Sequence, residues 1–470
     1  MSRRSRGSPR VVAVLPRGEA IRNFVYTGAL QKVAETCPTT ICTVKPNDEI
    51  WTLINREFGE VYPLEDIPER WLTNVVRENL DMAHGRWLWC EAARHRWRMR
   101  DLEADSPGKK AKRLAKKLAA APFISRRGLD ALTGLERRVS KVLSTTDSYV
   151  ELYEQIRPSL VFNGSHIHSQ RATQAVQAAQ WLGVPTAAFV FSWDNLTSQG
   201  RIIPLYDYYL VWNEAIRNQL LEIYHQIGSE QVFVTGTPQF DFHSKPAFHW
   251  TREEFCEQVG ADPSRPIVLY STGMDNHMEG EPDIVEKIAE MLRRMTDLNR
   301  PQLLVRMYGK DRNPGRFDAM RSRCPDVLFP ETRWEKSFFT PQPQDSWLLV
   351  NALRHAAVGI NIASTISLEL CMFDRPVINV NYLAHGQRVR FDYRQYYNYE
   401  HYKPIVDSGA LMLASSEVQM EQQLRLCLTH PAQGSAERQR LIRTMFGSSL
   451  DGRAGERVAK ILVELAGRAA

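Results

Sequence analysis

The chain has 470 residues, a formal net charge of +6, and 43% hydrophobic and 24% charged residues. This length exceeds what a single hydrophobic core normally holds, so we expect two domains. The composition is typical of a folded globular protein and excludes general disorder, and no apolar run approaches the roughly 20 residues of a membrane span.

The chain begins with a basic stretch, and we expect residues 1–10 to form a disordered tail. The apolar run that follows, from Val11 to Leu15, is too short for the core of a signal peptide. The seven cysteines are spread from Cys37 to Cys427 without a CxxC pair or a metal-ligand spacing. Because unpaired thiols are typical of reducing compartments, the expected location is the cytoplasm.

The first half of the chain alternates short apolar runs with amphipathic segments. The runs that we interpret as buried strands are 11–15, 39–44, 159–165, 185–191, 208–212 and 232–236. The segments that we interpret as helices are 24–35, 148–157, 169–183 and 213–228, with Gly183 as a helix-ending residue. Continuous apolar strands separated by helices indicate a parallel sheet covered on both faces.

The same pattern restarts after an aromatic linker around Pro246. Strands are predicted at 266–273, 301–309, 358–364 and 376–382, and helices at 251–260, 281–297 and 347–356. Thr251 and Glu254 have the spacing of a capping box. The sequence therefore predicts an α/β protein of two tandem doubly wound Rossmann-like domains, facing each other across a cleft.

We place the domain boundaries in the stretches where these patterns change. The expected N-terminal domain spans 11–245 and contains a basic helical insert at 64–150. The expected C-terminal domain spans 246–415, and 416–470 are predicted to be helices that pack back on the body. Between Arg86 and Arg127 the insert has thirteen basic and four acidic residues, a net charge of +9 that leaves −3 for the rest of the chain.

Hydroxyl residues cluster where the predicted strand 358–364 meets a helix. Ser364, Thr365 and Ser367 stand at the start of this helix, and Glu369 follows one turn later. A helix N-terminus has unpaired N–H groups and a partial positive charge that suit a phosphate. We expect the hydroxyls to add donors and the carboxylate to accept from ribose hydroxyls; ordinary helix capping is the alternative for each residue taken alone.

Two further strand ends of the second domain carry polar or small residues. Thr272 and Gly273 follow one predicted strand, and Arg306 and Lys310 follow the next. Ligands of parallel sheets bind outside the carboxyl ends of the strands, so these residues are predicted to converge on the same ligand as the hydroxyl cluster. Arginine and lysine would supply full charges to phosphates there.

The first domain offers candidates for a general base. His166 and His168 follow one predicted strand, and Asp194 follows the next. Any of the three could remove a proton from an acceptor hydroxyl, although Asp194 is equally suited to form an Asx turn. Two histidines without a third ligand nearby are weak evidence for metal, so no metal site is expected. The chain contains no GxGxxG, GxxxxGK[ST], HExxH or GxSxG sequence, which removes the usual support for redox, P-loop, zincin and serine-hydrolase functions.

Several of these strings resemble a known family. The sequences FSWDNLTSQG, VFVTGTPQFD, NIASTISLELCMFDRPVINV and YYNYEHYKPIVDSGALMLASS are similar to glycosyltransferases of the GT-B fold that act in bacterial surface-polysaccharide synthesis. Two of the strings are also similar to CDP-glycerol glycerophosphotransferases and UDP-N-acetylglucosamine epimerases, which share the fold. One departure is Tyr308-Gly309, where relatives commonly have His-Pro.

The resemblance implies a glycosyltransferase that moves a sugar from a nucleotide-sugar donor to a glycan or lipid-linked acceptor. It places Ser364, Thr365, Arg306 and Lys310 near the donor phosphates and Glu369 near the ribose, with no cofactor and no required metal ion. The alternatives are an epimerase, a CDP-alcohol phosphotransferase, or a scaffold that binds nucleotide or carbohydrate without catalysis.

The basic insert suggests a further partner. Tryptophans and arginines alternate at its start and lysines follow, which suits an anionic membrane surface contacted through residues 86–127. We therefore expect peripheral binding at the inner face of the membrane; a solvated helical arm is the equally weighted alternative. Nucleic acid is not expected as a partner, because the insert has no RNA- or DNA-binding motif.

Overall fold

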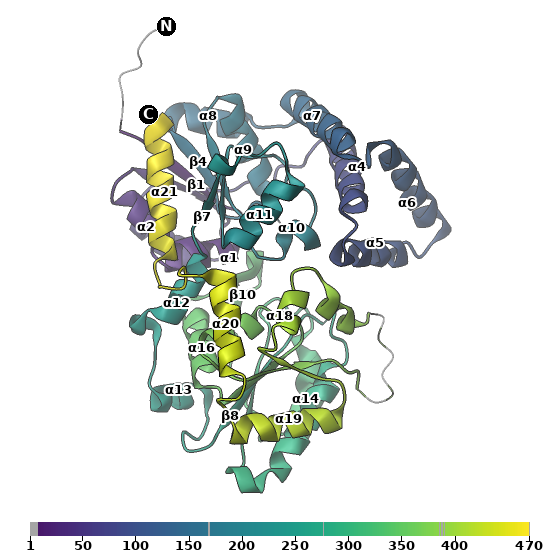
Figure 1. Cartoon of the computed structure of the whole chain (residues 1–470). Helices are drawn as coiled ribbons and strands as arrows, with labels where there is room; N and C mark the ends of the chain where they lie inside the picture. Colours follow the sequence, from purple (N-terminus) through teal and green to yellow (C-terminus); the bar gives the residue numbers. More distant parts are fainter. Residues whose placement is uncertain are drawn as a thin grey trace. The chain divides into compact units, whose positions relative to one another are not determined.

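The computed structural model describes residues 8–167, 170–275, 277–384, 386, 389 and 391–469 (Figure 1). The chain divides into two compact units. The first holds the described residues up to Asp241 together with those from Ser449 onward, and the second runs from Phe242 to Ser448. The predicted C-terminal group 416–470 is thus divided, since its last helix belongs to the first unit and the rest to the second.

The first unit is built on a seven-stranded parallel sheet. Its strands are β1 (Val11–Leu15), β2 (Thr39–Thr43), β3 (Val61–Pro63), β4 (Leu160–Asn163), β5 (Thr186–Phe189), β6 (Tyr208–Val211) and β7 (Val232–Val234). They are arranged in the order β3-β2-β1-β4-β5-β6-β7. The chain reverses its direction of travel across the sheet between β1 and β4, so the carboxyl ends of these two strands flank the topological switch point where doubly wound sheets bind ligands.

Helices cover this sheet. They are α1 (Gly18–Ile21), η1 (Arg22–Tyr26), α2 (Ala29–Ala34), α3 (Asp48–Phe58), α8 (Asp147–Ile156), α9 (Arg171–Trp181), α10 (Asn195–Ser198), α11 (Glu214–Ile223) and α21 (Ala454–Ala469). The short helix α12 (Asp241–Ser244) begins at the residue where the chain passes into the second unit. The single helix predicted at 24–35 is interrupted, because Gly28 has a φ of 81° in the left-handed region that glycine readily adopts. Gly183 ends α9 as predicted, with a φ of 71°.

The predicted basic insert is an arm of four helices, visible beside the sheet of the first unit (Figure 1). The helices are α4 (Trp71–Leu88), α5 (Glu91–Glu103), α6 (Pro107–Ala120) and α7 (Arg126–Leu143). A small apolar core that includes Leu80, Ala120 and Leu132 holds the arm together, and Trp87 packs against it. Trp97 lies half-buried under the Arg113 guanidinium, 4.7 Å from its ring centre. These two tryptophans therefore stabilise the arm itself.

The second unit contains a five-stranded parallel sheet in the order β14-β13-β12-β8-β9. Its strands are β8 (Ile267–Ser271), β9 (Gln302–Arg306), β12 (Val358–Asn361), β13 (Val377–Val380) and β14 (Met412–Ala414). Its main helices are α13 (Arg252–Val259), α14 (Glu281–Arg294), α15 (Asp318–Arg323), α16 (Pro343–His355), α17 (Ile366–Met372), α18 (Lys403–Asp407), α19 (Glu417–Thr429) and α20 (Ser435–Phe446). The switch point of this sheet lies between β8 and β12.

The predicted fold class is confirmed: the chain consists of two tandem Rossmann-like α/β units, with a basic helical insert in the first. The capping box at the start of α13 is also confirmed, because Thr251 accepts from the Glu254 N–H and the Glu254 carboxylate accepts from the Thr251 N–H. Among the described residues, no helix is both long enough and apolar enough to cross a membrane.

Candidate functional site

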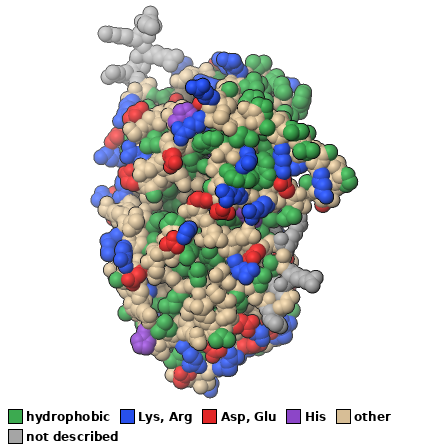
Figure 2. Space-filling model, turned by 45° about the vertical axis from the view of Figure 1, so that its right-hand side comes forward, with side chains coloured by type: hydrophobic (Ala, Val, Ile, Leu, Met, Phe, Trp, Pro, Cys, Tyr) green, Lys and Arg blue, Asp and Glu red, His purple; other side chains and the backbone are tan. Residues whose placement is uncertain are grey.

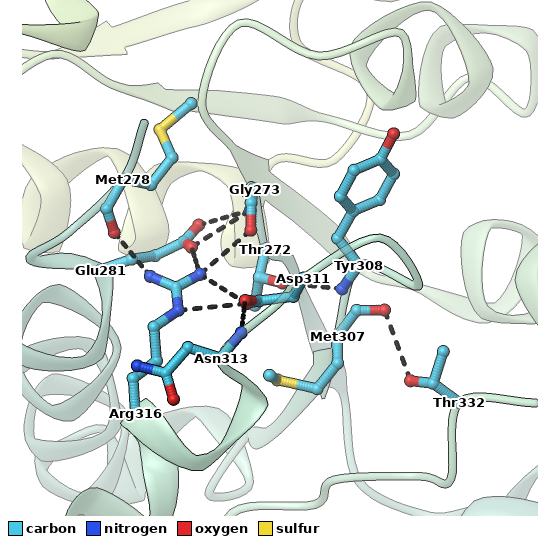
Figure 3. Close-up of polar contacts among 10 residues, drawn as sticks. All are labelled: Thr272, Gly273, Met278, Glu281, Met307, Tyr308, Asp311, Asn313, Arg316 and Thr332. Carbon is cyan, nitrogen blue, oxygen red and sulfur yellow. Dashed lines mark hydrogen bonds and ion pairs between the residues drawn. The ribbon is translucent and has the colours of Figure 1, made fainter. Parts of the chain in front are cut away.

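A buried ion-pair cluster fixes the loops after β8 and β9 in the second unit (Figure 3). The Arg316 guanidinium donates to Glu281 Oε2 at 2.8 Å and to Asp311 Oδ2 at 3.1 Å. It also donates to the Gly273 carbonyl at 3.0 Å, while the Gly273 N–H donates back to Glu281. The loop after β8 is therefore tied to the loop after β9 through one arginine.

Glu281 is fully buried in this cluster. Burial raises the pKa of its carboxyl to about 7, against the opposing effects of the Arg316 charge and the Gly273 N–H. Thr272 adds a second tie between the loops, because its hydroxyl accepts from the Tyr308 N–H at 2.9 Å. The predicted site residues Thr272 and Gly273 therefore hold the two strand ends in register, through their own hydrogen bonds.

Arg306, predicted to contact phosphate, lies at the end of β9 and is buried. Its guanidinium donates to Asp345 Oδ2 at 2.6 Å, and the same carboxylate oxygen accepts from the Trp334 indole N–H at 2.7 Å. Lys310 lies beyond this pair, half-buried, with its ammonium 5.9 Å from the Tyr308 ring centre and 5.7 Å from that of Phe339. Of the two predicted cations, Lys310 is therefore the more accessible.

The hydroxyls after β12 fall into two groups. The Ser367 hydroxyl is completely buried and bonds to the Asn361 side chain at 3.0 Å, to the Tyr402 hydroxyl at 2.8 Å and to Asn379 at 3.1 Å. Ser364 and Thr365 are half-buried, and Ser364 Oγ accepts from the Ile366 N–H at 3.3 Å. The expectation that Ser367 also donates to a phosphate is wrong, because its hydroxyl belongs to a buried network.

Glu369 lies on α17, one turn after the hydroxyls, as predicted. Its Oε2 is 2.9 Å from His243 Nε2, and both side chains are buried. The His243 ring stacks on Phe373 with 5.5 Å between ring centres. The histidine therefore fixes the position of the carboxylate that we predicted to face a ribose.

The topology brings most of the predicted residues of the second unit to one place. Thr272 and Gly273 follow β8, Ser364 and Thr365 follow β12, and these strands are neighbours at the switch point. The fixing partners Glu281, Arg316, Asp345 and His243 were not found from sequence. No local motif marks them, since each is an ordinary helix or loop residue whose partner lies 35 to 126 residues away.

In the first unit, His166 lies after β4 at the switch point. Its Nδ1 is 3.2 Å from the Phe189 carbonyl and 3.3 Å from the Phe191 nitrogen. Donation from Nδ1 to the Phe189 carbonyl leaves Nε2 as the proton acceptor that a base requires, whereas donation from the Phe191 N–H to Nδ1 requires the tautomer with the proton on Nε2. The other predicted histidine, His168, lies outside the described residues.

Asp194, the third candidate base, is engaged in its own turn. Its Oδ1 accepts from the Ser192 hydroxyl and its Oδ2 from the Ser198 hydroxyl, each at 2.5 Å. This is the turn-forming role that the sequence allowed as an alternative. Within the described part of the chain, no group of three or more His, Cys, Asp or Glu side chains is placed to hold a metal ion.

A cavity of about 930 Å³ lies between the helical arm and the sheet of the first unit. One wall is formed by α4, α5 and α6, and the other by His166, Ile167, Gln170, Arg201 and Ile203. The candidate base His166 therefore faces a space large enough for a small ligand. Asp194 is not among the lining residues.

The two Rossmann-like units that follow each other along the chain form the GT-B fold. Among solved structures, the chain is similar to the UDP-GlcNAc 2-epimerase of Neisseria meningitidis bound to UDP-GlcNAc, with 14% identity, a TM-score of 0.55, and 97% of this chain and 100% of that chain covered. It is also similar to the Methanocaldococcus jannaschii UDP-GlcNAc 2-epimerase in complex with UDP-GlcNAc and UDP, with 12% identity, a TM-score of 0.51, and coverage of 97% and 99%. At such identities the likeness shows the fold alone. No family model and no curated protein matches the chain.

Proposed function

We propose that this chain is a glycosyltransferase that uses a nucleotide-sugar donor. The observation that carries the proposal is the switch point of the second sheet, where Thr272 and Gly273 after β8 stand beside Ser364 and Thr365 after β12. Half-buried hydroxyls at the carboxyl ends of parallel strands suit the phosphates of a nucleotide. Support also comes from the fold, since both solved structures named above contain UDP-GlcNAc.

In the proposed reaction the second unit binds the donor and the first unit supplies the acceptor. Ser364 and Thr365 donate to the diphosphate, Lys310 offsets charge that develops as the nucleotide leaves, and Glu369 accepts from the ribose. His166 is the favoured base among the three candidates, because it faces the cavity of the first unit. It would take the proton of the acceptor hydroxyl as the glycosidic bond forms.

A thermal-shift screen with UDP, GDP, CDP, CMP and TDP tests the donor site, because a ligand that binds the folded state stabilises it. We expect at least one nucleotide to raise the melting temperature. The double variant Ser364→Ala/Thr365→Ala should then bind that nucleotide at least tenfold more weakly, since each hydrogen bond to a charged group contributes about 1.5–3 kcal/mol. The control is Ser322→Ala, whose exposed hydroxyl bonds only within its own helix. If no nucleotide stabilises the protein, the proposal fails.

The identity of the base is tested by two variants. His166→Gln should lower turnover about a hundredfold or more while nucleotide affinity stays unchanged. Asp194→Asn should retain most of the turnover and lose some stability, because its carboxylate holds a turn. The opposite outcome, in which Asp194→Asn abolishes turnover in a protein that still melts normally, would make Asp194 the base.

Epimerisation is the second candidate function, because the solved structures of this fold named above are epimerases. Incubation with UDP-GlcNAc separates the two. Conversion into a second UDP-sugar without an acceptor favours the epimerase, whereas slow release of UDP favours the transferase. Binding without either product would indicate the non-catalytic scaffold.

Membrane association remains a prediction for the arm. Leu114 and Leu118 are exposed on α6 beside its lysines, and basic and hydrophobic side chains are intermixed on this side of the molecule (Figure 2). We expect the protein to sediment with anionic liposomes at low salt and to be released at high salt. A protein that stays in the supernatant at low salt would leave the arm with no role at a membrane.

A further inference from the structure

The cavity under the helical arm is strongly basic. Among its lining residues, seven are arginine or lysine and three are aspartate or glutamate. Much of this charge is neutralised locally: Arg77 pairs with Glu69 and Glu136, and Lys116 pairs with Glu78 at 2.6 Å. What matters for binding is the charge that is left after these pairs are formed.

Arg201 is the clearest case of such a remaining charge. Its side chain lines the cavity, the residue is only 6% exposed, and within the described part of the chain it makes no hydrogen bond and no ion pair. The Tyr224 ring lies 5.0 Å from the guanidinium carbon. Burial lowers the pKa of Arg201, so the protein holds this cation at a cost in stability.

Among the titratable groups around Arg201, Asp130 interacts favourably with its charge but forms no ion pair with it; the Asp130 carboxylate lies 3.1 Å from His225 Nε2. His84 is buried beside it, and burial together with the Arg201 charge lowers the pKa of this imidazole to about 3, so it is neutral. The Asp81 carboxylate is taken by Arg100 at 2.8 Å and faces Arg96 at 4.0 Å. A Cβ at Gly200 would meet the carboxylate end of the Asp81 side chain, so the loop that carries Arg201 lies close to α4.

The opposite wall adds two more basic side chains. Arg113 gives its Nε to Asp101 at 2.8 Å, but its Nη2 is buried without a hydrogen-bond partner. Lys112 is exposed at the rim and makes no ion pair with any described residue. Arg201, Arg113 and Lys112 thus present donors to one cavity from two sides.

We propose that this cavity is a binding site for a phosphate-bearing ligand. A guanidinium matches a phosphate through paired N–H donors, and a dianion would offset the buried charge of Arg201. The volume of about 930 Å³ suits a phosphorylated small molecule or a lipid headgroup. If the proposed function is correct, the ligand is the acceptor, because His166 lines the same cavity; the anion site itself does not depend on that function.

Calorimetry with inorganic phosphate and with glycerol 3-phosphate, at constant ionic strength set by chloride, tests the site. We expect saturable binding by the wild-type chain and at least tenfold weaker binding by Arg201→Met. The matched control is Arg98→Met, because Arg98 is exposed on α5 and does not line the cavity. Equal binding by wild type and Arg201→Met would overturn the proposal.

The sign of the stability change gives a second and independent result. Without phosphate, Arg201→Met should melt at the same temperature as the wild type or higher, since it removes a buried unpaired charge. With phosphate present, the wild type should gain stability and the variant should not. A variant that is clearly less stable in both buffers would show that Arg201 serves packing against Tyr224, against the proposal.

If Arg201→Met fails to fold, substitutions of two lysines on α6 still test the proposal. Both are exposed and make no ion pair with any described residue, but Lys112 lines the cavity and Lys110 does not. Lys112→Gln should weaken phosphate binding severalfold and Lys110→Gln should not. Equal effects of the two substitutions would indicate general charge attraction and overturn the site.

Vesicles of phosphatidylcholine with phosphatidic acid distinguish the source of the phosphate. Binding to these vesicles that requires Arg201, without binding of soluble phosphate, would identify a lipid headgroup as the ligand. Saturable binding of soluble phosphate would identify a free phosphate ester. Vesicle binding that is unaffected by Arg201→Met, with no soluble binding, would contradict the proposal. The nucleotide screen tests the second unit and does not depend on phosphate binding in the first unit. Each of the two proposals can therefore be contradicted without affecting the other.

Discussion

Buried arginines at two sites of this protein, one in each unit, have contrasting surroundings. In the second unit, Arg306 and Arg316 each have a carboxylate partner within 2.8 Å at the strand ends. In the first unit, Arg201 is buried to a similar degree and has no such partner among the described residues. Paired charges form a framework that is complete without ligand, whereas an unpaired buried charge implies that something else completes it.

The comparison distinguishes two roles of charged residues, structural pairing and ligand binding, that cannot be told apart in the sequence. The second unit uses its charges to fix the loops around the switch point, beside the half-buried side chains of Ser364 and Thr365. The first unit leaves a guanidinium at the base of a cavity. Each role predicts a different response to substitution, and the following experiments test the contrast from the largest expected effect to the smallest.

Removing the central arginine of the paired cluster should have the largest effect. Arg316→Met would leave Glu281 and Asp311 buried without their cation, and we expect a loss of about 3–5 kcal/mol in the free energy of unfolding. Urea denaturation measures it. The control is Arg323→Met, which breaks an ion pair of a 55% exposed arginine with Glu286 and should change stability by about 1 kcal/mol or less. Similar losses in both variants would remove the distinction between the clusters.

The hydroxyls after β12 offer a matched pair within four residues. Ser367→Ala leaves Asn379 and Tyr402 with unmade hydrogen bonds inside the core, so we expect a loss of about 1–3 kcal/mol. Ser364→Ala should change stability by only about 0.5 kcal/mol, because that side chain is half-buried and supports one weak bond. If Ser364→Ala proves as destabilising as Ser367→Ala, Ser364 is structural and unsuited to bind phosphate.

Because of Glu281, the free energy of unfolding should decrease as the pH rises. Its pKa in the folded protein is about 7, above the ordinary value of 4.5, so the folded state binds more protons than the unfolded state between these values. The stabilisation from this group is present below about pH 4.5 and is lost as pH rises through 7. The slope contributed by one group is at most about 1.4 kcal/mol per pH unit.

Comparing wild type with Glu281→Gln by denaturation at pH 5, 6, 7 and 8 isolates this contribution. The decline between pH 5 and 7 should be shallower in the variant, because glutamine does not titrate. Parallel curves for the two proteins would mean that Arg316 keeps Glu281 ionised throughout, in conflict with the raised pKa.

The smallest effect is expected at the rim of the basic cavity. Lys112→Gln and Lys110→Gln should each change the free energy of unfolding by about 0.5 kcal/mol or less, since neither ammonium pairs with a described carboxylate. A melting curve checks both. A large loss for Lys112→Gln would mean that the rim lysine supports the arm, and that its effect on phosphate binding is indirect.

Much of the architecture can be predicted from local patterns in the sequence. The apolar runs at 11–15 and within the predicted strand 301–309 form buried parallel strands, because such strands are covered on both faces. Thr251 and Glu254 form the predicted capping box, because capping involves residues only three apart. The short edge strands β3 and β14 were not predicted, although the equally short edge strand β7 was.

What the tertiary structure decided is which polar residues are paired. The sequence by itself placed hydroxyls and cations at strand ends, because parallel sheets bring those ends to one edge. It could not separate Ser364 from Ser367, or show that Arg306 forms an ion pair with Asp345 while Arg201 forms none with any described carboxylate, since the groups involved come from elements far apart in the chain. The periodicity of a helix or strand depends on residues that are close together in the sequence, whereas the partner of a buried charge depends on which distant elements pack against it.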